Sequence, residues 1–185
     1  MLEVRAVPCT LILTIVMALA SSNTLPSVQK AWAHSVIATI PIGNSPFTVK
    51  INHNTGNVYV GNDDGTVSVI SPSNKVIATI PVGGDPREIA VNPNTGNVYV
   101  ASAVNRDDGT VSVISPSNKV IATIPVGGFP GEIAVNPNTG NVYVVNREDD
   151  TVSVISPGNK VIATIPVGGV DTEGGGGFAD DDMIR

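Results

Sequence analysis

The stretch NTGNVYVASAVNRDDGTVSVISPSNKVIATIPVGG, residues 94–128, decides the fold because its three phrases recur along the chain. The ending VIATIPVGG, or a close variant of it, begins at Val36, Val76, Val120 and Val161. The phrase NTGNVYV begins at Asn54, Asn94 and Asn138, and TVSVI begins at Thr66, Thr110 and Thr151. The endings are spaced by 40, 44 and 41 residues. The chain therefore holds three copies of one unit after a fragment of a fourth, and a repeat of this length is typical of propellers and solenoids.

Each copy contains four β-type runs separated by turn residues, which is the content of one propeller blade. In the second copy these runs are Glu88–Asn92, Asn97–Val100, Thr110–Ser115 and Lys119–Val126. They are apolar at nearly every position instead of alternating with charge, so both faces of each sheet should be covered. Blades that pack side by side provide this cover. A parallel β-helix is the alternative, but its coils usually use fewer residues and lack tight hairpins.

The units resemble the YVTN family of β-propeller repeats, which occurs in surface-layer and other secreted proteins of archaea and bacteria. The tetrad of the family reads here Tyr59-Val60-Gly61-Asn62, Tyr99-Val100-Ala101-Ser102 and Tyr143-Val144-Val145-Asn146. Its third residue differs from the family pattern in every copy, and its fourth residue differs in one. The resemblance covers Val36–Gly169 and implies a propeller fold and an extracytoplasmic location. It implies no reaction.

We therefore expect an all-β protein with a β-propeller-type repeat, in which three four-stranded antiparallel blades follow one orphan outer strand, Val36–Ile42. The repeat region, 34–169, divides into a partial blade and three full blades, with bounds 34–46, 47–84, 85–128 and 129–169. Closed propellers use four or more blades, so this sector is incomplete. Two apolar blade faces are left uncovered, and we expect self-association through them.

The repeat pattern stops abruptly after Gly169. The Gly-rich acidic segment 170–185 that follows is predicted to be disordered. The abrupt change is equally typical of a longer propeller that has been truncated, and the sequence leaves both readings open.

Residues 1–33 have the features of a signal peptide. Arg5 precedes an apolar stretch, Leu11–Ala20, that is short for a membrane-spanning helix. Ala31-Trp32-Ala33 provides an A-x-A cleavage site directly before the repeats, and Ala18-Leu19-Ala20 provides an earlier one. We predict a secreted or cell-surface protein that does not span the membrane once this segment is cleaved.

An uncleaved anchor is the alternative, because Glu3 weakens the basic end of the segment. The only cysteine, Cys9, also lies there, so a mature chain would have neither a disulfide nor thiolate chemistry. The formal net charge is −6, but segment 170–185 carries five acids and one base, which leaves −2 for the rest. The nearly neutral repeats argue against a nucleic-acid partner.

Length differences among the copies fall in one loop. From the tetrad tyrosine to the next TVSVI threonine the distances are 7, 11 and 8 residues, whereas from that threonine to the following tyrosine the distance is 33 both times. In an up-and-down blade this loop lies on the same face as the inter-blade links, GNSPFT, GGDPRE and GGFPGE, which vary too. Repeat proteins commonly carry insertions on the binding face. We predict that a protein or cell-surface partner contacts Phe47, Arg87, Arg106, Phe129 and Arg147 in these loops.

The same loops carry pairs of acidic residues, Asp63, Asp64, Asp107, Asp108, Asp149 and Asp150. Aspartate is favoured in hairpin turns because its side chain bonds the local backbone. Clustered carboxylates can also bind Ca²⁺ weakly, but the spacing here is not that of an EF-hand. We predict turn residues and no metal.

The sequence offers little for catalysis. His34 lies beside the expected cleavage site, and His53 occupies a turn position that holds Pro93 and Pro137 in the other copies. No Ser/His/Asp set, metal-ligand spacing or phosphate-binding loop is recognisable. We predict a non-catalytic interaction module without a cofactor. A structural subunit of a surface layer is the alternative, and an extracellular lyase or quinoprotein-like enzyme is a third.

Overall fold

The computed structural model describes residues 35–168, which form twelve strands and no helix. The chain divides into two compact units, Met1–Thr39 and Ile40–Arg185, and every described strand belongs to the second. The expected signal peptide at 1–33 and the tail at 170–185 lie outside the described residues. Between residues 35 and 168 the chain has no helix able to cross a bilayer.

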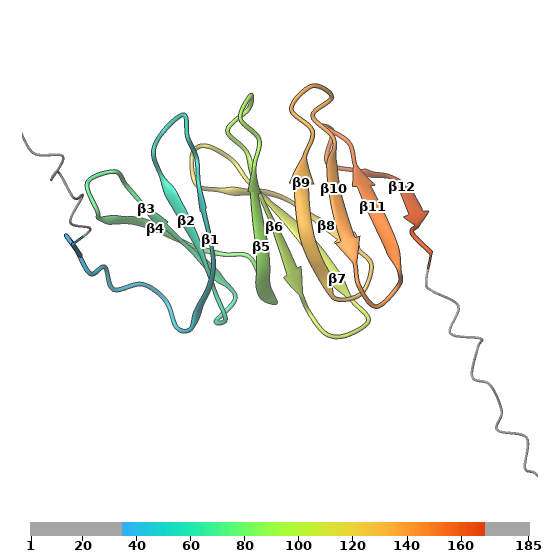
Figure 1. Ribbon diagram of the computed structural model, residues 1–185, viewed down its shortest axis with the longest axis horizontal. Helices are drawn as coiled ribbons and strands as arrows, with labels where there is room; N and C mark the ends of the chain where they lie inside the picture. The colour runs from blue at the N-terminus through green and yellow to red at the C-terminus, as the bar shows by residue number, and fades with distance from the viewer. Residues whose placement is uncertain (1–34, 169–185) are drawn as a thin grey trace, which may run out of the picture. The chain divides into compact units, whose positions relative to one another are not determined.

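The strands form three four-stranded antiparallel sheets, each made of four consecutive strands (Figure 1). The first sheet contains β1 (Pro46–Ile51), β2 (Val58–Asn62), β3 (Thr66–Ile70) and β4 (Val76–Pro81). The second contains β5 (Asp85–Val91), β6 (Val98–Ala103), β7 (Gly109–Ile114) and β8 (Val120–Val126). The third contains β9 (Pro130–Val135), β10 (Val142–Asn146), β11 (Thr151–Ile155) and β12 (Val161–Pro166). The all-β, propeller-type architecture predicted from the repeats is confirmed, with one blade for each copy.

The orphan strand expected at Val36–Ile42 does not form, because residues 35–42 carry no strand. The segment has the sequence of an outer strand, but outer strands pair within their own copy, as β4 does with β3. Within residues 35–168, every third strand pairs with the outer strand of its own copy, so none is left as a partner for this segment. Since the N–H and C=O groups of a strand need a neighbouring strand, the outer-strand sequence alone does not produce one.

The turn after each first strand is fixed by a side chain. Asn52 Oδ1 accepts a hydrogen bond of 3.0 Å from the backbone N–H of Asn54, and Asn92 and Asn136 accept the equivalent bonds. A glycine with positive φ then closes the turn. Gly96 has φ +73° and donates its N–H to the carbonyl of Asn92 at 2.8 Å. The NTGN phrase is therefore a hairpin turn in every copy.

Apolar side chains fill the space between neighbouring blades. The first junction contains Tyr59, Val67, Val69, Ile80, Val82, Ile89, Val98, Val100 and Ile114. The second contains Ala90, Tyr99, Ala101, Val111, Val113, Ile124, Ile133, Val142, Val144 and Ile155. At both junctions the tetrad tyrosine and the outer-strand isoleucine of one blade meet the first and second strands of the next. The middle strands of the central blade, β6 and β7, are therefore buried on both faces, as their continuous apolar sequence predicts.

Two blade faces have no neighbouring blade among residues 35–168. In the first blade Val49 is 60% exposed, whereas Ile89, at the same position of the middle blade, is fully buried. In the last blade Ile165 is 46% exposed, whereas its counterpart Ile124 is 4% exposed. We call the first surface, with Val49 and Ile51, the first-blade face. The second, with Tyr143, Ile165 and Val167, is the last-blade face.

Candidate functional site

The variable loops and the inter-blade links lie together on one side of the sheets, here called the loop side. The N–H groups of Val82 and Gly83, where β4 leads into the link between the first two blades, donate to the carbonyl of Gly65, in the β2–β3 loop, at 2.9 and 3.2 Å. In the last blade the N–H of Arg147 donates to the carbonyl of Phe129 at 3.3 Å. Length variation therefore falls on the face that the up-and-down topology indicates.

Four of the five predicted contact residues line one cavity of about 260 Å³ on the loop side. These four residues, Phe47, Arg87, Phe129 and Arg147, are called the loop-side cluster. Glu88 and a Pro-Gly-Glu segment at residues 130–132 complete the lining. Because the four come from all three blades, the cavity exists only when the blades are packed.

Arg87 occupies the centre of the cluster. Its guanidinium carbon lies 5.5 Å from the ring centroid of Phe47 and 5.0 Å from that of Phe129. Contacts of this kind contribute about 0.5–1 kcal/mol each at exposed sites and more when the cation is desolvated. Arg87 Nη2 also lies 3.3 Å from Asp85 Oδ2, whereas its buried Nε finds no hydrogen-bond partner among residues 35–168. The two rings and Asp85 therefore hold the guanidinium in place, and one of its five N–H donors is bound to Asp85.

Two members of the cluster lie in strands and not in loops, which corrects the sequence-based expectation. Phe47 belongs to β1 and Arg87 to β5, and in both strands the register shifts at that residue. A proline precedes each of them, and proline is tolerated at the first residues of a strand. The register shift is a β-bulge, a feature that redirects a side chain, and here it accompanies two side chains that line the cavity.

Phe129 and Arg147 reach the cavity from irregular backbone. Phe129 directly precedes β9 with φ +45°, an unfavourable conformation for a bulky residue. Arg147 follows β10, and its side chain lies over Gly131, where an added Cβ would meet the Arg147 Nε. Gly131 is the counterpart of Phe47 and Arg87 in the last blade. Arg147 thus fills from a loop the place that a side chain of β9 would otherwise take.

Arg106, the fifth predicted contact residue, does not line the cavity. Its Nε lies 3.0 Å from Glu148 Oε1, and its side chain is 79% exposed. This ion pair joins the β6–β7 loop to the β10–β11 loop. Exposed pairs contribute little to stability, so Arg106 is a surface residue of the loop side outside the cluster.

The acidic loop residues hold turns and links. Asp64 accepts a hydrogen bond of 2.5 Å from the Thr66 hydroxyl, which lowers the pKa of Asp64 below its ordinary value of 3.8. Asp149 accepts one of 3.0 Å from the N–H of Gly128, and Asp108 accepts one of 2.9 Å from an asparagine of its own loop. Across residues 35–168, no three side chains of His, Cys, Asp or Glu gather into a metal-binding group.

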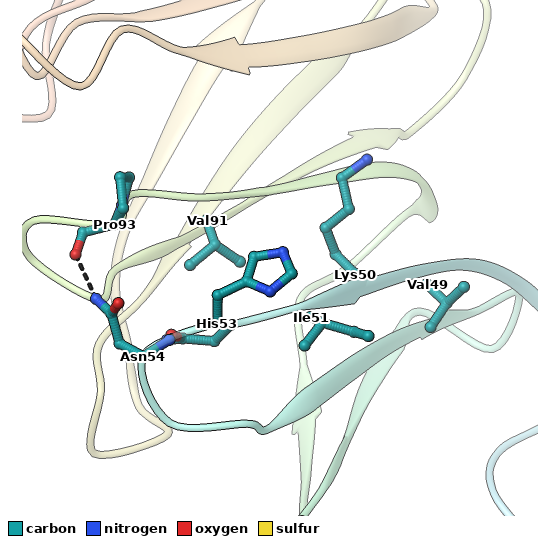
Figure 2. A pocket seen from close by; sticks show the side chains of 8 residues that line it. Val49, Lys50, Ile51, His53, Asn54, Val91 and Pro93 are labelled. Atoms are coloured by element: carbon teal, nitrogen blue, oxygen red, sulfur yellow. Dashed lines mark hydrogen bonds between the residues drawn. The ribbon is translucent and has the colours of Figure 1, made fainter.

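A larger cavity, of about 530 Å³, lies at the opposite ends of β1 and β5 (Figure 2). It is lined by Val49, Lys50, Ile51, Asn52, His53, Asn54, Val91 and Pro93. Figure 2 shows Asn54 bound to the backbone carbonyl of Pro93, and Lys50 Nζ is bound to Glu88 Oε1 at 3.0 Å. Val49 and Ile51 belong to the first-blade face, so part of this cavity is the uncovered end of the sector.

The sequence-based reasoning missed this second cavity, which lies on the side of the nearly invariant turns. A usable signal was present. Lys50 and His53 stand where the other copies have alanine and proline, and both line the cavity. Differences in loop length do not point to these two positions, because the turn that contains His53 has the same length in every copy.

No protein-family model matches the chain, and no curated protein sequence matches it. Solved structures do match. Hydrazine synthase of Kuenenia stuttgartiensis has a TM-score of 0.60 and 22% identity over 71% of this chain and 38% of that chain. Dihydro-heme d1 dehydrogenase NirN in complex with DHE has a TM-score of 0.56 and 15% identity over 70% of this chain and 29% of that chain. A functionally unknown protein from Desulfotomaculum acetoxidans DSM 771 has a TM-score of 0.57 and 13% identity over 71% and 46%.

The chain spans less than half the length of each of these three chains. At identities between 13% and 22%, these similarities support the fold only, and the activities in the names belong to those proteins. Together with the three consecutive antiparallel sheets, these likenesses give the chain the fold of a β-propeller.

Proposed function

We propose that this chain is a YVTN-type β-propeller module, secreted or displayed at the cell surface, that binds a protein partner through the loop-side cluster and has no catalytic activity of its own. The observation that carries the proposal is the convergence of Phe47, Arg87, Phe129 and Arg147 on one cavity. The location rests on the export features of residues 1–33 and on the resemblance to secreted repeat proteins.

The repeats themselves supply a comparison. The TVSVI and IATIPV phrases are the same in the three copies, as a scaffold requires. The position after the link proline instead holds Phe47, Arg87 and Gly131, with Arg147 above the glycine. A purely structural position would be expected to keep one residue type, so this variation supports recognition.

The chemistry of the cluster favours a partner that presents a carboxylate. Arginine and aromatic residues dominate the energetics of protein interfaces, and arginine binds carboxylates through two parallel hydrogen bonds. The carboxylate of Glu88 is already bound to Lys50 and to the N–H of Ile89, at 3.0 and 3.2 Å. The terminal N–H groups of Arg87 that do not bind Asp85, together with the guanidinium of Arg147, therefore remain as the groups that would receive an acidic side chain or a chain terminus.

Selection of a displayed random peptide library on the purified chain tests this function. Peptides with aspartate, glutamate or a free C-terminus should be enriched, and their affinity can be measured by fluorescence polarisation. We expect Arg87→Ala and Arg147→Ala each to weaken binding at least about tenfold, the size of a moderate interface contact.

Arg106→Ala is the matched control, because it removes an arginine of the loop side outside the cavity, and it should leave binding unchanged. Thr139→Ala, in a turn on the opposite side, should also have no effect. Binding that survives Arg87→Ala, or that Thr139→Ala weakens equally, would contradict the proposal.

A structural subunit of a surface layer is the second candidate, and the two uncovered blade faces are the observation that favours it. A layer component would assemble without limit as its concentration rises, whereas a module would stop at a closed species. A concentration series of mass measurements separates the two.

A further inference from the structure

We infer that two copies of this chain close one six-bladed ring, in which the last-blade face of each copy packs on the first-blade face of the other. The inference does not depend on the ligand of the loop-side cluster. It rests on the two junctions inside the chain, which show how one blade of this repeat covers the next.

The residues of a third junction are already present at the two ends. Inside the chain, Tyr59, Ile80 and Val82 of one blade meet Ile89, Val98 and Val100 of the next. The last-blade face carries the counterparts of the first set, Tyr143, Ile165 and Val167. The first blade carries the counterparts of the second set, Val49, Val58 and Val60. Val145 stands where the other copies have Gly61 and Ala101, so the new junction would also hold one larger apolar side chain.

The exposed apolar surface at the ends is specific to these junction positions. Val167 is 54% exposed, whereas its counterpart Val82, which lies inside a junction, is 7% exposed. Ile162 is also exposed, but so are its counterparts Ile77 and Ile121, which shows that no junction uses that position. Exposure that appears only where a neighbouring blade is missing identifies the covering partner as another blade of this kind.

A polar contact points to the same arrangement. The side-chain amide of Asn54 donates to the carbonyl of Pro93 in the next blade at 2.5 Å, and Asn94 donates to the carbonyl of Pro137 at 2.5 Å. Asn138 is the third residue of this series, and within residues 35–168 no acceptor receives its amide. The next acceptor of the series is the carbonyl of His53, the counterpart of Pro93 and Pro137. His53 lies in the first blade, so in the ring this acceptor comes from the other chain.

The number of copies follows from the geometry of closure. Propellers close with about four to eight blades. Residues 35–168 of one chain supply three sheets, so two chains give a ring in this range and three chains exceed it. A two-fold ring also uses every exposed blade face and leaves no end for further growth.

The full-length chain should therefore have the mass of two chains, against 19.0 kDa for one, in sedimentation equilibrium at micromolar concentration. We expect Val49→Asp and Ile165→Asp each to weaken dimerisation at least about a hundredfold, because a charge would be buried at each junction. Ile162→Asp, on the same strand as Ile165, is the matched control and should remain dimeric. Circular dichroism checks that all three variants keep their strand signal. A monomeric wild-type chain, or equal dissociation by Ile162→Asp, would overturn the inference.

Cross-linking tests the closure itself. In a Cys9→Ser background, Asn138→Cys combined with His53→Cys should be joined by a short bismaleimide into species of two chains and no larger. The pair Asn94→Cys and Pro137→Cys occupies the equivalent positions inside one chain and should cross-link without a gain in mass. A ladder of higher species, or no species of two chains, would show that the ring does not form.

Discussion

Asn62 and Ser68 are joined by a buried hydrogen bond of 3.0 Å across the hairpin of β2 and β3. The same side-chain amide donates to the hydroxyl of Thr66, also at 3.0 Å. Asn146 makes the two equivalent contacts in the last blade, both at 2.9 Å. The last residue of the YVTN-like tetrad thus holds the threonine and the serine of TVSVI. This contact gives a physical reason why the two phrases occur together in the first and last copies.

The middle blade lacks this contact, and the first prediction follows from its absence. Ser102 takes the place of the asparagine, and its buried hydroxyl finds no hydrogen-bond partner among residues 35–168. Open space lies beside Gly83, the link glycine of this copy. Ser102→Asn should bring an amide to Thr110 and Ser112 and raise the free energy of unfolding by about 1 kcal/mol. Urea denaturation of the full-length chain measures the difference.

The reverse change serves as the control. Asn146→Ser makes the last blade resemble the middle one and should lower the free energy of unfolding by about 1–3 kcal/mol, since it leaves buried polar groups without partners. If Ser102→Asn lowered stability as much as Asn146→Ser does, the middle blade would have no room for the amide.

The fold was predictable because local signals agree within each copy. The run expected at Thr110–Ser115 forms β7, Gly109–Ile114, and the turns on either side are those that asparagine and glycine favour. The sequence predicts the first strand of the middle copy at Glu88–Asn92, because a proline normally interrupts a strand ladder. The strand instead begins at Asp85 and includes the proline. The segment Val36–Ile42 was misassigned because strand formation depends on a partner, which a sequence phrase does not supply.

The site was predictable only in part. Variation among the copies singled out the segments that contain Phe47, Arg87, Phe129 and Arg147. The up-and-down topology of a blade was then enough to assign these segments to one side. The stacking of Arg87 between two rings depends on distances between separate blades, which no repeat phrase encodes. Arg106 was predicted with these residues because it lies in a variable loop, but its side chain pairs with Glu148 instead of lining the cavity.

A second prediction concerns close packing at the link between the middle and last blades. A Cβ added at Gly109 would lie 2.5 Å from the carbonyl oxygen of Gly127 and 2.5 Å from Cδ of Pro130. Both neighbours are held by the link, so they cannot move without a shift of the backbone. Gly109→Ala should lower the free energy of unfolding by about 1–3 kcal/mol, the usual cost of overpacking, in the same urea experiment.

Gly158→Ala is the matched control for this change. The nearest atom to an added Cβ there is Ser156 Oγ at 3.7 Å, an ordinary contact, so the stability should change by less than about 0.5 kcal/mol. An equal loss in both variants would mean that the two glycines are needed for their backbone freedom and not for space.

The last prediction is a loss of stability at alkaline pH. Tyr59 and Tyr99 are buried at the two blade junctions, and burial raises the pKa of each above the ordinary value of 10.0. Side-chain hydrogen bonds oppose this shift, with Asn57 for Tyr59 and with Asn97 and Asn92 for Tyr99. The unfolded chain therefore releases these protons at a lower pH than the folded chain. The stabilisation that both groups contribute is complete below about pH 10 and is lost as the pH rises through the folded-state pKa values.

The free energy of unfolding should stay level up to about pH 10 and then fall, and the absorbance of tyrosinate should appear only at higher pH for these two residues. Tyr99→Phe should remove part of the pH dependence, because phenylalanine keeps the packing and has no proton to release. A decline of equal steepness in Tyr99→Phe would show that another group controls the alkaline transition.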